Sequence, residues 1–174
     1  FFFTKHISKN VFIGENCVLG QNTFIGENVK IGNGVKIQNN VSVFNGVEIQ
    51  DDVFIGPSVV FTNIKTPRSF INQKESFVST IIKHGASIGA NTTIICGNTI
   101  GKYSLIGAGT VITKSISDFS LEVGNPNKQI GWVTKNGDTI PFDYFKKNDI
   151  YFDKSNNTVY ELIQNKLIAK QIEK

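Results

Sequence analysis

A six-residue period runs through most of the chain and constrains its fold more than any other feature. Bulky apolar residues recur in one frame from Ile13 to Phe61 and in a second frame from Ile82 to Ile112. Small or β-branched residues stand two positions before the bulky ones in the first frame, and glycine often follows them directly. The bulky positions are Ile13, Leu19, Ile25, Ile31, Ile37, Val43, Ile49, Ile55 and Phe61, then Ile82, Ile88, Ile94, Ile100, Ile106 and Ile112.

A period of six fits neither an amphipathic helix nor a simple alternating strand, so it indicates a supersecondary repeat. We expect each hexad to form a short strand and a corner, and three hexads to form one triangular coil of about 18 residues. Coils should stack about 4.8 Å apart as parallel strands. Gly, Asn and Asp suit the corners because they tolerate the left-handed backbone conformation. The sequence therefore predicts an all-β parallel β-helix, whereas a β-sandwich needs variable strand lengths and turn spacings.

Two segments depart from the period. The step from Phe61 to Ile82 is too long for one hexad, so we expect a protruding loop near residues 62–78, which is a usual place for functional residues. After the β-helix domain, 1–130, we expect a capping extension, 131–174. There the segments 150–152 and 158–162 flank an Asn-Asn turn and predict a β-hairpin, with a third strand near 167–169. A helix over residues 158–172 is the alternative.

Charge and cysteine content narrow the functional classes. The formal net charge is +4 and the lysines are scattered, which disfavours nucleic acid and suits small anionic ligands. Cys17 and Cys96 lie outside any C-x-x-C motif, so we expect free thiols in a reducing compartment and a cytoplasmic protein. No apolar stretch is long enough to span a membrane, so no membrane partner is expected.

Few residues suit acid–base or metal chemistry. His6 and His84 are the only histidines, they are isolated in sequence, and no metal is expected. His6 precedes an inward isoleucine, so it should point outward, where it can approach a ligand in a groove. His84 is a candidate base at a corner, and Asp51-Asp52 fits a turn pair.

An outward polar patch suits a sugar and a nucleotide base. Gln38, Phe44 and Gln50 replace the expected glycines, with Asn39 and Asn40 beside them. Amides bond hydroxyl and acetamido groups, and a phenyl ring stacks on a base. The alternative is an Asn-rich ladder that only supports the corners.

With these residues in view, the chain resembles the hexapeptide-repeat acetyltransferases that N-acetylate nucleotide-linked 3-amino sugars. It looks closest to enzymes acting on UDP-2-acetamido-3-amino-2,3-dideoxyglucuronate, followed by those acting on dTDP-3-amino-3,6-dideoxyhexoses. The most specific stretches are K-I-Q-N-N at 36–40 and F-T-N at 61–63 with Pro67-Arg68. The remaining stretches that support the resemblance are 51–57, 85–91, 106–109, 123–126 and 130–132.

The resemblance implies a left-handed β-helix, a homotrimer, and acetyl-CoA in the cleft between neighbouring coils. It implies that Asn39, Asn40, Asn63 and Arg68 hold the sugar nucleotide. It also implies cofactor binding at Gly89, Ala90, Gly107, Ala108, Lys114 and Lys128. We take Asn39, Asn40 and His6 as candidate catalytic residues, and Gln38, Phe44, Asn63 and Arg68 as substrate-binding residues. Asn127 departs from the family, which often has Ala after Gly-Asn-Pro, and the usual upstream coil is absent.

The implied activity is transfer of acetyl from acetyl-CoA to the 3-amino group of a UDP- or dTDP-linked sugar, in cell-surface glycan (lipopolysaccharide) biosynthesis. Positioning can supply much of the rate, because a sugar amine with a pKa near about 8 is already partly neutral at pH 7. Two alternatives stay open. An O-acetyltransferase would need His6 or His84 as a base. A non-catalytic binding or assembly module, such as the regulatory end of a nucleotidyltransferase, would transfer no acetyl group.

Overall fold

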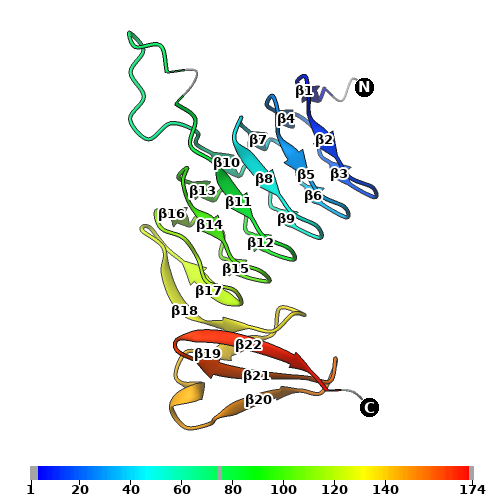
Figure 1. Cartoon of the computed structure of the whole chain (residues 1–174), viewed down its shortest axis with the longest axis vertical. Helices are drawn as coiled ribbons and strands as arrows, with labels where there is room; N and C mark the ends of the chain where they lie inside the picture. Colours follow the sequence, from blue (N-terminus) through cyan, green and yellow to red (C-terminus); the bar gives the residue numbers. More distant parts are fainter. Residues whose placement is uncertain (1–3, 74–75, 173–174) are drawn as a thin grey trace.

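Stacked three-sided coils make up most of the molecule, and an antiparallel extension follows them (Figure 1). The computed structural model describes residues 4–73 and 76–172. Each coil contributes one short strand to each of three parallel sheets, and partners in adjacent coils lie 18 residues apart before the loop, as in the pair His6 and Phe24. The predicted β-helix of hexapeptide repeats is confirmed, and the β-sandwich alternative is wrong.

The three parallel sheets are named A, B and C, in the order in which the chain visits them. Sheet A contains β1 (His6–Ile7), β4 (Phe24–Ile25), β7 (Ser42–Val43), β10 (Val60–Phe61), β13 (Thr93–Ile94) and β16 (Val111–Ile112). Sheet B contains β2 (Phe12–Ile13), β5 (Lys30–Ile31), β8 (Val47–Ile49), β11 (Thr80–Ile82) and β14 (Thr99–Ile100). Sheet C begins with β3 (Val18–Leu19), β6 (Lys36–Ile37), β9 (Phe54–Ile55), β12 (Ser87–Ile88) and β15 (Leu105–Ile106).

Sheet C continues into the extension and changes direction there. Strand β17 (Ser120–Val123) is still parallel to β15, whereas β18 (Lys128–Val133) and β19 (Thr139–Pro141) are antiparallel. Strand β18 runs across residue 130, at which we placed the domain boundary. A 3-10 helix, Tyr144–Lys146, then leads to sheet D, formed by β20 (Ile150–Asp153), β21 (Thr158–Ile163) and β22 (Lys166–Gln171). The hairpin and its third strand are confirmed, and the alternative helix over residues 158–172 is wrong.

The interior of the coils is filled by the periodic apolar side chains. From Ile25 to Ile112 every bulky position of the period is almost fully buried. Residues that line the first described coil, such as Ile13 and Leu19, are only partly buried. Asparagines occupy the corners with φ between 56° and 61°, a conformation that their short polar side chains tolerate. They are Asn10, Asn16, Asn22, Asn28, Asn40 and Asn91.

A column of aromatic rings joins the coils to sheet D. Tyr103 stacks on Phe119 with ring centroids 5.3 Å apart, and Phe119 meets Tyr160 edge-on at 5.6 Å. The Tyr160 hydroxyl accepts a hydrogen bond from the backbone N–H of Lys135 (2.7 Å). Burial raises the pKa of Tyr160 above its ordinary value of 10.0. Sheet D is therefore packed against the end of the coils by rings, which contribute both apolar area and a defined geometry.

The protruding loop leaves the β-helix between β10 and β11 and returns to it without disturbing the coils. In Figure 1 it projects sideways from the stack, away from sheet D. The backbone N–H of Val78 donates to the carbonyl of Asn63 (2.8 Å) and closes the neck of the loop. Strand β10 pairs with β7 before the loop and β11 pairs with β8 after it, so the predicted loop is confirmed.

Candidate functional site

Most of the predicted site residues lie along two edges that border sheet A. We call the turns that lead from sheet C to sheet A the C–A edge, and those that lead from sheet A to sheet B the A–B edge. The C–A edge contains Gln38, Asn39, Asn40, Gly89, Ala90, Gly107 and Ala108. The A–B edge contains Phe44, Lys114 and the protruding loop with Asn63 and Arg68. His6 lies on sheet A itself, and Lys128 begins β18.

Asn39 and Asn40 hold successive coils together. The backbone N–H of Gln21, one coil earlier, donates to Oδ1 of Asn39 (2.8 Å). The side-chain amide of Asn22 donates to Oδ1 of Asn40 (3.1 Å). Both side-chain oxygens thus bond to the preceding coil, as predicted by the alternative in which the asparagines form a ladder that supports the corners. Among the described residues, the amide N–H groups of these two side chains are left to reach a ligand.

The glycine corners of the C–A edge are required by close stacking of the backbone. A Cβ on Gly89 would lie 2.5 Å from the backbone nitrogen of Ala108, in the next coil. A Cβ on Gly56 would lie 2.7 Å from the backbone nitrogen of Ala90. Coil stacking thus accounts for these glycines, and the Gly-Ala corners place only small residues along this edge.

A groove of about 690 Å³ lies beside the first coils of sheet A, and aromatic rings form part of its wall. His6 and Phe24 stack with ring centroids 5.2 Å apart and planes only 7° from parallel. Phe44 packs against Phe24 at 5.6 Å. Phe77, near the C-terminal end of the loop, also lines the groove. Polar groups are supplied by Ser8, Glu27, Asn28 and Asn45.

The sequence reasoning missed Phe24 and Phe77 as parts of this groove. The coil period contained the signal for Phe24, because it follows His6 and precedes Ser42 by one coil of 18 residues each. Phe77 had no such signal, since the loop lies outside the period.

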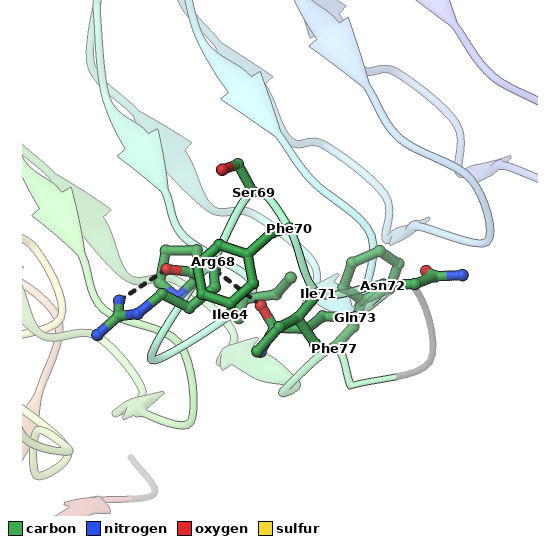
Figure 2. A pocket seen from close by; sticks show the side chains of 9 residues that line it. Ile64, Arg68, Ser69, Phe70, Ile71, Asn72, Gln73 and Phe77 are labelled. Atoms are coloured by element: carbon green, nitrogen blue, oxygen red, sulfur yellow. Dashed lines mark hydrogen bonds between the residues drawn. The ribbon is translucent and has the colours of Figure 1, made fainter.

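A second hollow, of about 750 Å³, lies within the loop (Figure 2). Arg68 donates from Nη1 to the carbonyl of Pro67 (2.9 Å), and its backbone N–H donates to Oε1 of Gln73 (3.0 Å). Phe70 is 82% exposed near the tip. Phe77 lines this hollow as well as the groove beside sheet A, so the loop that contains Arg68 adjoins the stacked rings.

His84 lies on the third edge, between sheets B and C, and not with the other candidates. Its Nε2 shares a 2.9 Å hydrogen bond with the Tyr103 hydroxyl, and its Nδ1 lies 3.9 Å from Oδ2 of Asp52. The ring meets Tyr103 edge-on, at the start of the aromatic column. Oδ1 of Asp51 accepts from the backbone N–H of Asn33, one coil earlier, as expected for a turn residue. These contacts connect His84 to side chains of the same edge and of the aromatic column, which is consistent with a structural role.

Cysteine, metal and membrane features can be stated for the described residues. Cys17 and Cys96 are free thiols, as expected. Within residues 4–73 and 76–172, no three His, Cys, Asp or Glu side chains gather closely enough to hold a metal ion. In the same part of the chain no helix is long and apolar enough to cross a membrane.

Comparisons with known proteins match the two halves of the β-helix separately. Residues 4–76 match the family model described as the GMPPB C-terminal domain, and residues 80–114 match the hexapeptide repeat of succinyl-transferase. A dTDP-3-amino-3,6-dideoxy-α-D-galactopyranose 3-N-acetyltransferase of Aneurinibacillus thermoaerophilus is 54% identical over 59 residues. That match covers 34% of this chain and 31% of the relative, so the chain matches about a third of the relative's length.

Solved structures share the fold. A hexapeptide-repeat containing acetyltransferase of Vibrio cholerae O1 biovar eltor, complexed with acetyl coenzyme A, superposes with a TM-score of 0.63 at 23% identity and covers 72% of both chains. A mutant of AntD, an N-acyltransferase of Bacillus cereus in complex with dTDP and coenzyme A, gives a TM-score of 0.57 at 23% identity over 76% of this chain and 83% of that one. The six-residue period and the stacked coils together show a parallel β-helix fold built from six-residue repeats, of which residues 80–114 match the hexapeptide-repeat model.

Proposed function

We propose that this protein transfers an acetyl group from acetyl-CoA to the 3-amino group of a UDP- or dTDP-linked amino sugar. The supporting observation is the arrangement around sheet A, which has a groove walled by stacked rings on the side of the A–B edge and a row of small Gly-Ala corners along the C–A edge. Such a groove suits a planar base, and such an edge suits a narrow thiol ester arm. The partial match to a dTDP-3-amino-sugar acetyltransferase supports the same chemistry and favours dTDP.

The acceptor nucleotide is assigned to the groove beside sheet A. His6 stacks on Phe24, and Phe44 packs against Phe24 from the next coil, so the outer face of the His6 ring is proposed as the surface on which a pyrimidine stacks. Asn28 and Asn45 present amides that can bond the base or the sugar hydroxyls. Asn63 and Arg68 of the loop complete the proposed acceptor site, with the Arg68 guanidinium as the partner for an anionic group, and Gln38 on the C–A edge is proposed to reach it from a neighbouring copy.

The donor is assigned to the C–A edge. Gly89, Ala90, Gly107 and Ala108 would border the pantetheine arm, and Lys114 and Lys128, both exposed, would meet the CoA phosphates. Three copies of the chain would bring a donor edge and an acceptor groove together in a shared cleft, which is why we propose a homotrimer. Cell-surface glycan synthesis in the cytoplasm is the setting proposed for this reaction.

In the proposed reaction the neutral sugar amine attacks the thioester carbonyl, a C–N bond forms, and the C–S bond breaks. The amine loses one proton, and CoA leaves as the thiol after its sulfur gains one. Selecting the neutral form of an amine with a pKa near about 8 costs only about 1.4 kcal/mol at pH 7. Positioning is worth up to about 7–11 kcal/mol, so no protein base is required. The amide N–H groups of Asn39 and Asn40 are proposed to steady the developing oxyanion.

The test is release of free thiol from acetyl-CoA with UDP- and dTDP-linked 3-amino sugars as acceptors. Phe24→Ala should raise the acceptor KM by about tenfold, because the His6 ring loses the support that holds it for stacking on a base, an interaction worth about 1–3 kcal/mol. Phe12→Ala is the matched control, since Phe12 is an outward phenylalanine on sheet B, 64% exposed and outside the groove. Equal acceptor KM values for the two variants would refute the placement of the base, and absence of thiol release by the unchanged protein would refute the activity.

One alternative has an observation of its own. The match of residues 4–76 to the GMPPB C-terminal domain favours a binding or assembly module. Such a module would release no thiol and would not bind CoA. The O-acetyltransferase alternative makes a different prediction, because a hydroxyl acceptor needs a base. In that case His6→Ala would abolish activity with a hydroxyl acceptor, whereas amine transfer in our proposal would fall only by the loss of ring stacking.

A further inference from the structure

A buried carboxylate with only neutral partners lies near the C-terminal end of the coils. Glu122 is 5% exposed. The Ser120 hydroxyl donates to its Oε1 (2.9 Å), and the Asn127 amide nitrogen donates to its Oε2 (3.0 Å). Hydrogen bonds to a buried charge are stronger than neutral ones, so the carboxylate fixes which end of the Asn127 amide faces it. The nitrogen of Asn127 points to Glu122, and its oxygen points the other way.

The oxygen of Asn127 completes the last strand of sheet A. Oδ1 accepts from the backbone N–H of Thr113 (2.9 Å) and lies 3.2 Å from the Thr113 hydroxyl. The backbone N–H of Asn127 donates to the carbonyl of Val111, whose own N–H donates to Gly124. The turn 124–127 thus occupies the place that a further coil would have beside β16. These bonds account for the burial of the Asn127 amide, which is 2% exposed, at the end of the coils.

The two lysines proposed to meet the CoA phosphates flank this link. Lys114 follows Thr113 directly, and Lys128 follows Asn127 directly. Lys114 belongs to the loop after β16, whereas Lys128 begins β18, so the chain alone does not hold them together. The buried amide joins the two backbones at the residues next to the lysines and sets the separation of the backbone positions from which the two ammonium groups extend.

We propose that Glu122 and Asn127 are positioning residues for a phosphate-binding pair formed by Lys114 and Lys128. This inference rests on the proposed function, because it takes the pair as the site for the phosphates of CoA. The pair recognises phosphate and not the thioester arm. Loss of the Asn127 amide therefore weakens the binding of acetyl donors that contain phosphates and leaves the binding of donors without phosphates unchanged.

The experiment compares Asn127→Ala with Asn98→Ala. Asn98 is a matched control, because it is 8% exposed and its amide donates to the carbonyl of Ile95 (2.8 Å) within its own corner, which lies beside the segment of Lys114 but does not connect it to Lys128. We expect Asn127→Ala to bind CoA about tenfold more weakly by calorimetry, as for loss of one charge-assisted contact, and Asn98→Ala to bind normally. With S-acetylpantetheine, which lacks the nucleotide phosphates, Asn127→Ala should keep its kcat/KM.

A double-mutant cycle separates positioning from general destabilisation. In a Lys114→Ala, Lys128→Ala background, Asn127→Ala should cause no further loss of CoA affinity. Equal loss for Asn127→Ala and Asn98→Ala, equal loss with both donors, or full additivity in the cycle would each overturn the inference. If the unchanged protein binds CoA but transfers no acetyl group, only the proposed function fails, and the calorimetric comparison still decides this inference. If it binds no CoA, both fail.

Discussion

Substitution of Gly89 by alanine tests whether backbone stacking at the C–A edge limits which residues the corner accepts. The added Cβ would lie 2.5 Å from the nitrogen and 2.8 Å from the Cα of Ala108. An ordinary contact begins near 3.4 Å, so the two coils would have to separate by roughly 0.9 Å at this corner. The neighbouring atoms are backbone, which cannot rotate away as a side chain can.

The expected cost follows from the geometry. Overpacking costs about 1–3 kcal/mol, and a backbone obstacle places this site near the upper value. The shift also stretches the 2.8 Å hydrogen bond from the Gly89 N–H to the carbonyl of Ile106. For a chain of this size, about 3 kcal/mol corresponds to a fall in Tm of roughly 6–12 °C.

The assay is thermal unfolding followed by far-ultraviolet circular dichroism, with Gly109→Asn as the control. Gly109 has a φ of +72° and nothing within 4 Å of an added Cβ, and asparagine tolerates this conformation. Its Tm should stay close to that of the unchanged protein. The stacking argument would be refuted if Gly89→Ala had the Tm of the unchanged protein, or if the Tm of Gly109→Asn fell as far as that of Gly89→Ala.

Two further predictions concern the aromatic column. Tyr160→Phe should cost about 1 kcal/mol at neutral pH, because the hydrogen bond from the backbone N–H of Lys135 to the Tyr160 hydroxyl is lost. Burial raises the pKa of Tyr160 in the folded state, so its contribution to the free energy of unfolding is complete below pH 10.0 and is lost as the pH rises through the folded-state pKa. Urea unfolding from pH 9 to 11 should therefore show a steeper fall in the free energy of unfolding for the unchanged protein than for Tyr160→Phe. His84→Ala should lower stability by about 1 kcal/mol through its lost bond to Tyr103 and leave kcat/KM nearly unchanged. A His84→Ala protein that is inactive yet binds both substrates would contradict a mechanism without a base.

The coils were predictable because each position of the period has one physical role. An inward isoleucine such as Ile88 is buried by the coils on either side of it, and a corner residue such as Asn40 adopts φ near +60°. The same period fixed the place of the loop, since Phe61 and Ile82 are too far apart for one hexad. Regular stacking converts sequence spacing directly into spatial neighbours.

The site was only partly predictable, because the same asparagine can support a corner or bind a ligand. Asn39 and Asn40 have both the residue type and the place for either role, and only the structure shows their oxygens bonded to the preceding coil. Asn127 was noted only as a departure, since its link to Thr113 depends on how the chain turns after the last coil. Phe77 was missed because a loop has no period from which its position follows.

The neck of the protruding loop has a consequence for how such a protein can change. Ser42 pairs with Val60 just before the loop, Val47 pairs with Thr80 just after it, and the ladder continues as if the intervening residues were absent. Grafts of different length or composition between Asn63 and Val78 can therefore keep the hydrogen bond from the Val78 N–H to the Asn63 carbonyl at their ends. Binding preference and scaffold stability can accordingly be varied independently, by exchange of this single segment.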